Sequence, residues 1–302
     1  MPATALHDVV DRPGPSRPAD SHVPAPGLSK PSERSGWSAR RLKRPLMMAG
    51  GALAGMAFLP YLFSAYLVCG LLDFTRNREK TLASWERYFV GNGLFTWLLS
   101  PFNLLMDLLC QPHQNKGVYR LTDLPPDYQC EIHQLLAAVH EQDLVGQLQS
   151  RMSGHQRGMI FFKWYGRNLP TSLDVPEFHQ PFRYIRTIGV SVFNKRQSTG
   201  KHFGPLRVTL RLLYNINPID SDQVYIQVGG HTNYWRDNPL FIFDDTLQHQ
   251  SVNGSDAVRY CMFVDILRPS LVPRVMSAIL ASVRVIVAPF NAVFYQKWTF
   301  VK

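Results

Sequence analysis

The chain has 302 residues and a formal net charge of +10, and it contains only four cysteines. This length is enough for one sizeable domain with additional segments. The cysteines are scattered and form no Cys-x-x-Cys pair, which argues against a disulfide framework or a zinc site and favours a reducing compartment. The positive charge indicates an anionic partner such as nucleic acid, acidic lipid or a phosphorylated substrate.

The first segment, residues 1–44, is rich in Pro, Ser and Arg and poor in aliphatic residues. Such a composition does not bury enough apolar surface to offset the entropy of ordering the chain, so we predict a disordered tail. Its acidic residues and prolines argue against a transit peptide.

Residues 45–111 are predicted to form membrane-embedded helices. The run 45–72 has no charged side chain, is flanked by basic residues on both sides, and is long enough to span a bilayer core. The alternative is a buried helix of a soluble domain. A second apolar stretch, 88–110, is interrupted by Pro101 and Asp107, and it suits the return arm of a hairpin or a helix lying in the interface. The number of spans stays open between one and three.

The predicted catalytic domain, residues 112–270, begins with a helical pattern between Ile132 and Leu148. The pattern then changes to short alternating or β-branched runs separated by turn residues, which predicts an antiparallel sandwich or barrel. The expected strands are Ile188–Phe193, Arg207–Tyr214, Val224–Val228, Leu240–Phe243 and Tyr260–Ile266. Residues 271–302 are expected to form an apolar C-terminal helix on the surface of the domain or the membrane.

Two histidines, His202 and His249, are placed so that separate strands of a barrel would present them together. A pair of neutral imidazoles that leaves adjacent coordination positions open suits iron(II) in an oxygenase. An arbitrary pair among ten histidines is more often structural, so the flanking residues decide. His202 begins a His-x-Gly-Pro motif with Arg211 nine positions later, and His249 follows a Phe-Asp-Asp run with Arg259 ten positions beyond it.

These motifs resemble the aspartyl/asparaginyl β-hydroxylase family of iron(II)- and 2-oxoglutarate-dependent dioxygenases. The resemblance covers roughly 75 residues and also includes Trp235 and Asp265. It implies a mainly β fold, a double-stranded β-helix of the jelly-roll or cupin-like kind, with flanking helices. It implies Fe(II) and 2-oxoglutarate as cofactors and molecular oxygen as co-substrate.

The same resemblance assigns roles to individual residues. His202 and His249 would bind the metal, and Arg259 would bind the distal carboxylate of 2-oxoglutarate through its planar fork of donors. Ser191 would add a hydroxyl donor to that carboxylate. Arg211 would be a second anchor, or alternatively a salt-bridge partner within the barrel.

The third iron ligand is open at this stage. The common triad has Asp or Glu two positions after the first histidine, where this chain has Gly204. This looks like the branch of the family in which water takes that place. Asp244 and Asp245 are the nearby acids that would compensate, although a structural role in a turn is favoured for both.

The membrane segment and the Phe161-Phe-Lys-Trp-Tyr165 motif resemble the branch of bacterial lipid A 2-hydroxylases, which usually carry His-Arg-Asp-Pro as the first-ligand motif. We therefore expect a membrane-bound enzyme that hydroxylates the acyl chain of an anionic lipid, lipid A-like or ornithine lipid. It would lie at the bacterial inner membrane with its domain facing the cytoplasm, which supplies both cofactors. Six basic residues near His202 in the sequence are expected to form a rim for the head group, or simply a solvated face. They are Arg183, Arg186, Lys195, Arg196, Lys201 and Arg207.

Three functional classes remain. The first is the lipid hydroxylase. The second is a hydroxylase of aspartyl or asparaginyl side chains in proteins or peptides. The third is a non-catalytic, membrane-anchored binding domain that keeps the barrel. No nucleic acid partner is expected, because no recognised binding motif or aromatic platform accompanies the charge.

Overall fold

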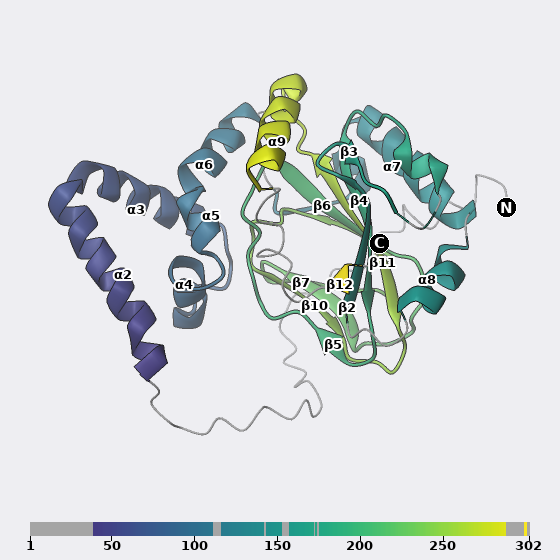
Figure 1. Ribbon diagram of the computed structural model, residues 1–302, viewed down its shortest axis with the longest axis horizontal. Coiled ribbons are helices and arrows are strands. Elements are labelled where there is room, and N and C mark those ends of the chain that lie inside the picture. Colours follow the sequence, from purple (N-terminus) through teal and green to yellow (C-terminus); the bar gives the residue numbers. More distant parts are fainter. Residues whose placement is uncertain are drawn as a thin grey trace.

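The computed structural model describes residues 39–110, 116–141, 143–152, 157–171, 173, 175–287 and 299–300. The helices within these residues are α2 Ala39–Phe58, α3 Pro60–Phe74, α4 Leu82–Phe89, α5 Leu94–Leu98, α6 Ser100–Leu109, α7 Pro126–Glu141, α8 Leu144–Met152 and α9 Pro273–Val287. Helices α2 to α6 project from one side of a β domain, and α7 and α8 cover the other side (Figure 1).

The β domain consists of two sheets. The larger sheet has the strand order β1-β9-β6-β11-β4-β2-β12, with β3 paired to β2, and the smaller sheet has the order β5-β10-β7-β8. The strands are β1 Val118–Tyr119, β2 Arg157–Trp164, β3 Arg167–Asn168, β4 Ile185–Phe193, β5 Gln197–Ser198, β6 Thr209–Asn215, β7 Val224–Val228, β8 His231–Tyr234, β9 Leu240–Phe243, β10 His249–Asn253, β11 Arg259–Leu267 and β12 Thr299–Phe300. All pairings are antiparallel except that of β12 with β2.

Alternation along the strands of the large sheet builds two apolar layers. Tyr260 and Met262 of β11 point to a core shared with α7 and α8, whereas Cys261 points to a core between the two sheets. Successive side chains of a strand face opposite sides of the sheet, so one strand serves both layers. The predicted antiparallel, jelly-roll-like domain is confirmed, and the five predicted strands coincide closely with β4, β6, β7, β9 and β11.

The helix predicted between Ile132 and Leu148 is two helices. Helix α7 ends at Glu141 and α8 begins at Leu144. Buried leucines of both helices, among them Leu135 and Leu148, belong to the same core on the outer face of the large sheet. This layer leaves the inner face of the sheet for the candidate site.

The continuous helix predicted over residues 45–72 is not formed. The chain makes α2 and α3 instead, with a break at Leu59, because Pro60 has no backbone N–H to continue α2 and is favoured in the first turn of α3. Helix α2 also begins at Ala39, inside the segment predicted to be disordered, while residues 1–38 lie outside the described part of the chain. Of the helices described here, none has the combination of length and apolar character needed to cross a bilayer.

The second apolar stretch, residues 88–110, forms the end of α4 and the short helices α5 and α6. Pro101 lies in the first turn of α6 and fixes the start of that helix. Helix α3 packs against α5 and α6, so these helices form one unit beside the barrel. The predicted C-terminal helix corresponds to α9, whose Met276 and Leu280 pack with Met106 of α6; residues 288–298 lie outside the described chain.

A buried ion-pair network joins this helical unit to the barrel. Arg207, which is 1% exposed and precedes β6, pairs with Asp73 of α3, with Asp107 of α6 and with Asp244 after β9. Arg76 adds a bond of 2.6 Å to Asp244. Burial alone would raise the pKa of Asp244, but the surrounding guanidinium groups outweigh burial and lower it far below the usual range. The network therefore keeps the buried carboxylate of Asp244 ionised in the interior.

Replacing Arg207 with methionine tests the network. The substitution leaves the buried Asp73 and Asp244 with Arg76 but without Arg207, and breaking a buried pair in this way costs roughly 3–5 kcal/mol of unfolding free energy. The control is Arg196→Met, which removes an exposed ion pair with Asp256 and should leave stability nearly unchanged. Denaturant unfolding of the two variants measures the difference. Equal stability of Arg207→Met and the unmodified protein would contradict the role given to this network.

Candidate active site

The structure brings His202 and His249 together on the inner side of the small sheet. They form an isolated antiparallel bridge in which each backbone N–H donates to the carbonyl of the other at 2.9 Å. Their ring centroids are 4.1 Å apart. His249 is the first residue of β10, and His202 follows β5, which pairs with the far end of β10. The small sheet therefore fixes both rings side by side.

Both imidazoles are held in the same tautomer. Nδ1 of His202 lies 2.8 Å from the carbonyl oxygen of Gly200, and Nδ1 of His249 lies 2.8 Å from that of Leu247. A carbonyl oxygen only accepts, so each Nδ1 carries the hydrogen and each Nε2 presents a lone pair when the ring is neutral. Burial lowers the pKa of His202 to about 3, with a contribution from His249, and lowers the pKa of His249 to about 4.

Two neutral, oriented imidazoles are the histidine part of the two-histidine, one-carboxylate donor set that iron(II) takes in oxygenases. A hydrogen bond from the second ring nitrogen to a backbone carbonyl is the usual support of such ligands. In the described part of the chain, no group of three or more His, Cys, Asp or Glu side chains is already arranged to hold a metal ion. The structure thus provides an oriented pair that fits a metal, without a complete cluster.

Asp245 lies directly beside this pair. Its Oδ1 is 3.3 Å from Nε2 of His249 and 3.1 Å from Nη1 of Arg211. Its backbone carbonyl accepts a hydrogen bond of 2.8 Å from the N–H of Gly204. The turn between β9 and β10 therefore places one carboxylate against the second histidine.

Arg211, a candidate for binding the co-substrate, is already paired with acidic side chains. Its Nε donates to Oδ1 of Asp265 at 2.6 Å, and it also pairs with Asp245. The guanidinium lies 3.8 Å from the ring centroid of Phe263. Burial raises the pKa of Asp265, although Arg211 opposes that shift. This arrangement corresponds to the salt-bridge interpretation of Arg211.

Arg259 is buried without an acidic partner. Its side chain is 1% exposed, Nη1 donates to the hydroxyl of Ser251 at 2.9 Å, and Nε has no hydrogen-bond partner. The guanidinium lies 4.5 Å from the ring centroid of Phe193 and 5.2 Å from that of Trp235. Among the described residues, no carboxylate forms an ion pair with it, and burial lowers its pKa. A buried charge in this state is unfavourable unless a ligand of opposite charge joins it.

Arg259 and the histidine pair share one interior. Ser251, which contacts Arg259, lies two residues after His249 on β10, and residues two apart on a strand face the same side about 7 Å from each other. Ser191 lies two paired positions further along the sheet than Arg259, because Ser191 of β4 is opposite Cys261 and Phe193 is opposite Arg259. The hydroxyl of Ser191 donates to the carbonyl of Cys261 at 3.2 Å.

Ser251 is the site residue that sequence reasoning missed. Its position two residues after the second histidine was the available signal, because period-2 alternation puts both side chains on one face of β10.

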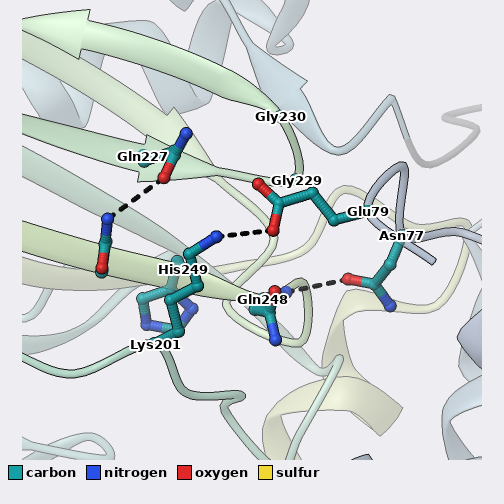
Figure 2. Close-up of a pocket in the computed structure, with 9 residues that line it drawn as sticks. Asn77, Glu79, Lys201, Gln227, Gly229, Gly230, Gln248 and His249 are labelled. Atoms are coloured by element: carbon teal, nitrogen blue, oxygen red, sulfur yellow. Dashed lines mark hydrogen bonds and ion pairs between the residues drawn. The ribbon is translucent and has the colours of Figure 1, made fainter. Parts of the chain in front are cut away.

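A small polar pocket opens beside His249 (Figure 2). Its lining residues are Asn77, Glu79, Lys201, Gln227, Gly229, Gly230, Gln248, His249 and Gln250. Figure 2 shows Lys201 reaching across to Glu79, and the two charged groups are 2.6 Å apart. Asn77 and Glu79 follow α3, so the helical unit supplies one wall of this pocket.

The predicted basic rim is wrong as a group. Arg207 is fully buried in the ion-pair network, and Arg196 pairs with Asp256 on the surface. Arg183 and Arg186 flank the start of β4, and of the six basic residues only Lys201 lines the polar pocket beside His249. Neighbouring positions in the sequence are therefore distributed to different parts of the fold.

Comparison with known proteins shows that the segment carrying this site is similar to a known family. Residues 130–269 match the model of the family described as Aspartyl/Asparaginyl beta-hydroxylase. The resemblance seen in the sequence is thereby confirmed, and all five predicted site residues lie inside the matched segment.

A curated relative is the "Ornithine lipid ester-linked acyl 2-hydroxylase" of Rhizobium tropici, which is 33% identical over 86 residues. The match covers 28% of this chain and 31% of the relative, so this chain spans about a third of the length of that protein.

Solved structures show weaker likeness. An oxidoreductase of the 2OG-Fe(II) oxygenase family from Burkholderia pseudomallei is 13% identical with a TM-score of 0.32, covering 43% of this chain and 80% of that one. A salicylate 1,2-dioxygenase variant from Pseudoaminobacter salicylatoxidans is 10% identical with a TM-score of 0.27, covering 48% and 34%. At these TM-scores the likeness supports no functional inference.

The substitution Arg259→Met separates a binding role from a structural one. An apolar side chain in place of an unpaired buried charge should keep or increase stability, by about 1–4 kcal/mol. The same substitution should abolish stabilisation by a small dicarboxylate such as 2-oxoglutarate, which for the unmodified protein amounts to about 2.7 kcal/mol at a concentration of 100 Kd. Thermal unfolding with and without the dicarboxylate measures both effects, and Arg196→Gln is the control. A dicarboxylate response retained in Arg259→Met would contradict the assignment.

Proposed function

We propose that this protein is a membrane-attached Fe(II)- and 2-oxoglutarate-dependent hydroxylase that acts on the acyl chain of a lipid. The observation that carries the proposal is the buried Arg259, which has no acidic partner among the described residues and contacts Ser251, two residues after His249 on β10. The match of residues 130–269 to the family model supports iron and 2-oxoglutarate as the groups that such a site takes.

In this proposal the two histidines and Arg259 have separate binding roles. His202 and His249 would hold the iron through Nε2, and the iron, when bound, supplies the activation of oxygen. Arg259 would bind the distal carboxylate of 2-oxoglutarate with its fork of donors, while Ser251 orients the guanidinium. Phe193 and Trp235 flank the guanidinium and exclude water, which strengthens its attraction for the carboxylate.

The helical unit supports membrane attachment. Helices α2 and α3 expose large apolar side chains at their junction, where Phe58 is 84% and Tyr61 is 92% exposed. Apolar side chains of α3 are exposed around the helix, as at Leu67, Val68, Leu71 and Leu72, and such a helix suits lipid better than a single protein groove. We propose that α2 and α3 insert into one leaflet, on the cytoplasmic side of a bacterial inner membrane, where both cofactors are supplied.

The polar pocket supports a lipid with a charged head group. Glu79 and Lys201 offer one charge of each sign at the mouth beside His249. An amino-acid head group, with an amine and a carboxylate, would satisfy both when their mutual ion pair opens. The name of the Rhizobium tropici relative, an ornithine lipid acyl 2-hydroxylase, agrees with this choice, and a lipid A-like substrate is the second candidate.

The activity test uses full-length protein extracted in detergent with iron(II), 2-oxoglutarate and candidate lipids. We expect mass spectrometry to show the gain of one oxygen atom on an acyl chain, with succinate formed in proportion. Replacing His249 with alanine should reduce turnover at least about 100-fold, because a metal ligand is lost. Oxidation of aspartyl or asparaginyl peptides instead of lipids would favour the peptide hydroxylase, and the absence of any substrate-dependent succinate would favour a binding domain.

Membrane attachment has its own test. The double substitution Phe58→Glu and Tyr61→Glu introduces charge at the α2–α3 junction and should reduce binding to anionic liposomes at least about tenfold, since each charged residue at membrane depth costs several kcal/mol. Dicarboxylate binding at Arg259 should be unaffected. The control is Gln134→Glu on the exposed face of α7, on the opposite side of the barrel (Figure 1). Unchanged liposome binding of the double variant would rule out insertion through this junction.

A further inference from the structure

A second pocket, of about 440 Å³, opens on the outer face of the large sheet. Its lining residues come from the end of β2, from β3, from the 3₁₀ helix Pro176–His179 and from the start of β4. They are Lys163, Gly166, Asn168, His179, Gln180, Pro181, Phe182, Ile185 and Arg186. Lys163 is opposite Ile188 of β4, whose side chain belongs to the core shared with α7. Arg186 is two residues before Ile188, and alternation puts it on the same side. The pocket is therefore separate from the interior that holds Arg259.

Lys163 brings a buried positive charge to this pocket. The residue is 4% exposed, its Nζ donates to the carbonyl oxygen of Gln180, and Nζ lies 5.0 Å from the ring centroid of Phe182. Burial, with a smaller contribution from the charge of Arg186, lowers the pKa of Lys163 to about 8. The ammonium group is therefore still mostly protonated at neutral pH, although it is out of contact with water.

The second cation, Arg186, has no partner of opposite charge. Among the described residues its guanidinium forms no hydrogen bond and no ion pair, and its Nε is buried. Glu131 is the acidic residue whose field reaches both cations. Its carboxylate oxygens accept the backbone N–H groups of Arg183, Tyr184 and Ile185 instead. None of the residues that line the pocket is acidic. Two neighbouring cations in this state are unfavourable unless an anion joins them.

The charge of the pocket matches a phosphate group. A phosphomonoester carries about −1.5 to −2 charges at pH 7, close to the combined charge of Lys163 and Arg186, whereas a carboxylate would neutralise only one of them. A guanidinium binds two phosphate oxygens through its fork of donors, and an ammonium adds a compact charge. The volume of the pocket exceeds that of a phosphate and lies in the range of small-molecule sites, so the ligand has an organic part.

We propose that the pocket of Lys163 and Arg186 binds the phosphate group of a phosphomonoester. The phosphate belongs either to a soluble molecule or to the head group of a lipid, and the contacts are the same in both cases. The inference does not depend on the proposed iron site, because the two sites share no residue. The competing interpretation is that both cations only contribute to a generally basic surface.

The test is calorimetric titration of the full chain with glycerol 3-phosphate. Arg186→Gln should weaken binding at least about tenfold, because a charge-assisted contact with the phosphate is lost. Folding should be little affected, since the guanidinium has no hydrogen bond to lose among the described residues. The matched control is Arg183→Gln, which removes the same charge from an exposed position of the same segment outside the pocket. Its affinity should stay within about threefold of that of the unmodified protein.

A second variant tests the other cation. Lys163→Gln removes the charge but keeps a donor for the carbonyl oxygen of Gln180, so the affinity for glycerol 3-phosphate should again fall at least about tenfold.

Vesicles identify the source of the phosphate. Flotation compares phosphatidylcholine vesicles with and without phosphatidic acid, whose head group is a phosphomonoester. If Arg186→Gln also removes the extra binding caused by phosphatidic acid, the phosphate belongs to a lipid. If that binding is unchanged while the affinity for glycerol 3-phosphate falls, the ligand is a soluble molecule.

Two results would overturn the inference. The first is that Arg186→Gln weakens neither the binding of glycerol 3-phosphate nor that of phosphatidic acid vesicles. The second is an equal loss in Arg183→Gln and Arg186→Gln, which would indicate attraction to the basic surface as a whole. Stabilisation by 2-oxoglutarate, which depends on Arg259 in the proposed function, should be retained in Arg186→Gln. Failure of one site is thereby distinguished from failure of the other.

Discussion

The reciprocal backbone hydrogen bonds between His202 and His249 set the geometry of the candidate site. They add one bridge at the first residue of β10, beyond the pairing of β5 with the other end of that strand, and hold two rings 4.1 Å apart with a common tautomer. The same strand, β10, then carries Ser251 to Arg259. A single strand thus relates the proposed metal-binding histidine His249 to the proposed carboxylate-binding residue Arg259. Pre-organisation of this kind reduces the ordering that must accompany ligand binding.

The helical unit is joined to this site by charge and by aromatic packing. Arg207 ties α3 and α6 to Asp244, the residue that precedes Asp245. Phe203, which follows His202, lies 5.3 Å from the ring of Tyr88 in an aromatic cluster with α3 and α4. The helices that expose apolar surface are therefore in direct contact with the neighbours of both histidines. If α2 and α3 enter a leaflet as proposed, these contacts orient the pocket beside His249 relative to the lipid.

The sequence predicts the parts of this structure that depend on periodicity and fixed spacing. The strands follow from alternation, because residues such as Cys261 and Met262 must face different layers, and the histidine pair follows from motif spacing.

The ion-pair network could not be predicted, because Asp73, Asp107, Arg207 and Asp244 meet only in the folded chain. Arg207 was consequently interpreted as part of a basic surface. Pro60 was a visible signal for the break between α2 and α3, but the uncharged run around it favoured one continuous helix. The position of Asp245 against Gly204 also depends on tertiary packing. The sequence alone therefore could not show which group lies beside Gly204.

The most direct test of the central claim is a crystal structure of the full chain with Mn(II) and 2-oxoglutarate, read from the anomalous signal of the metal. We expect one anomalous peak bonded to Nε2 of both His202 and His249, and the distal carboxylate of 2-oxoglutarate paired with the guanidinium of Arg259. A metal bound away from the two rings, or a dicarboxylate that leaves Arg259 unpaired, would contradict the account.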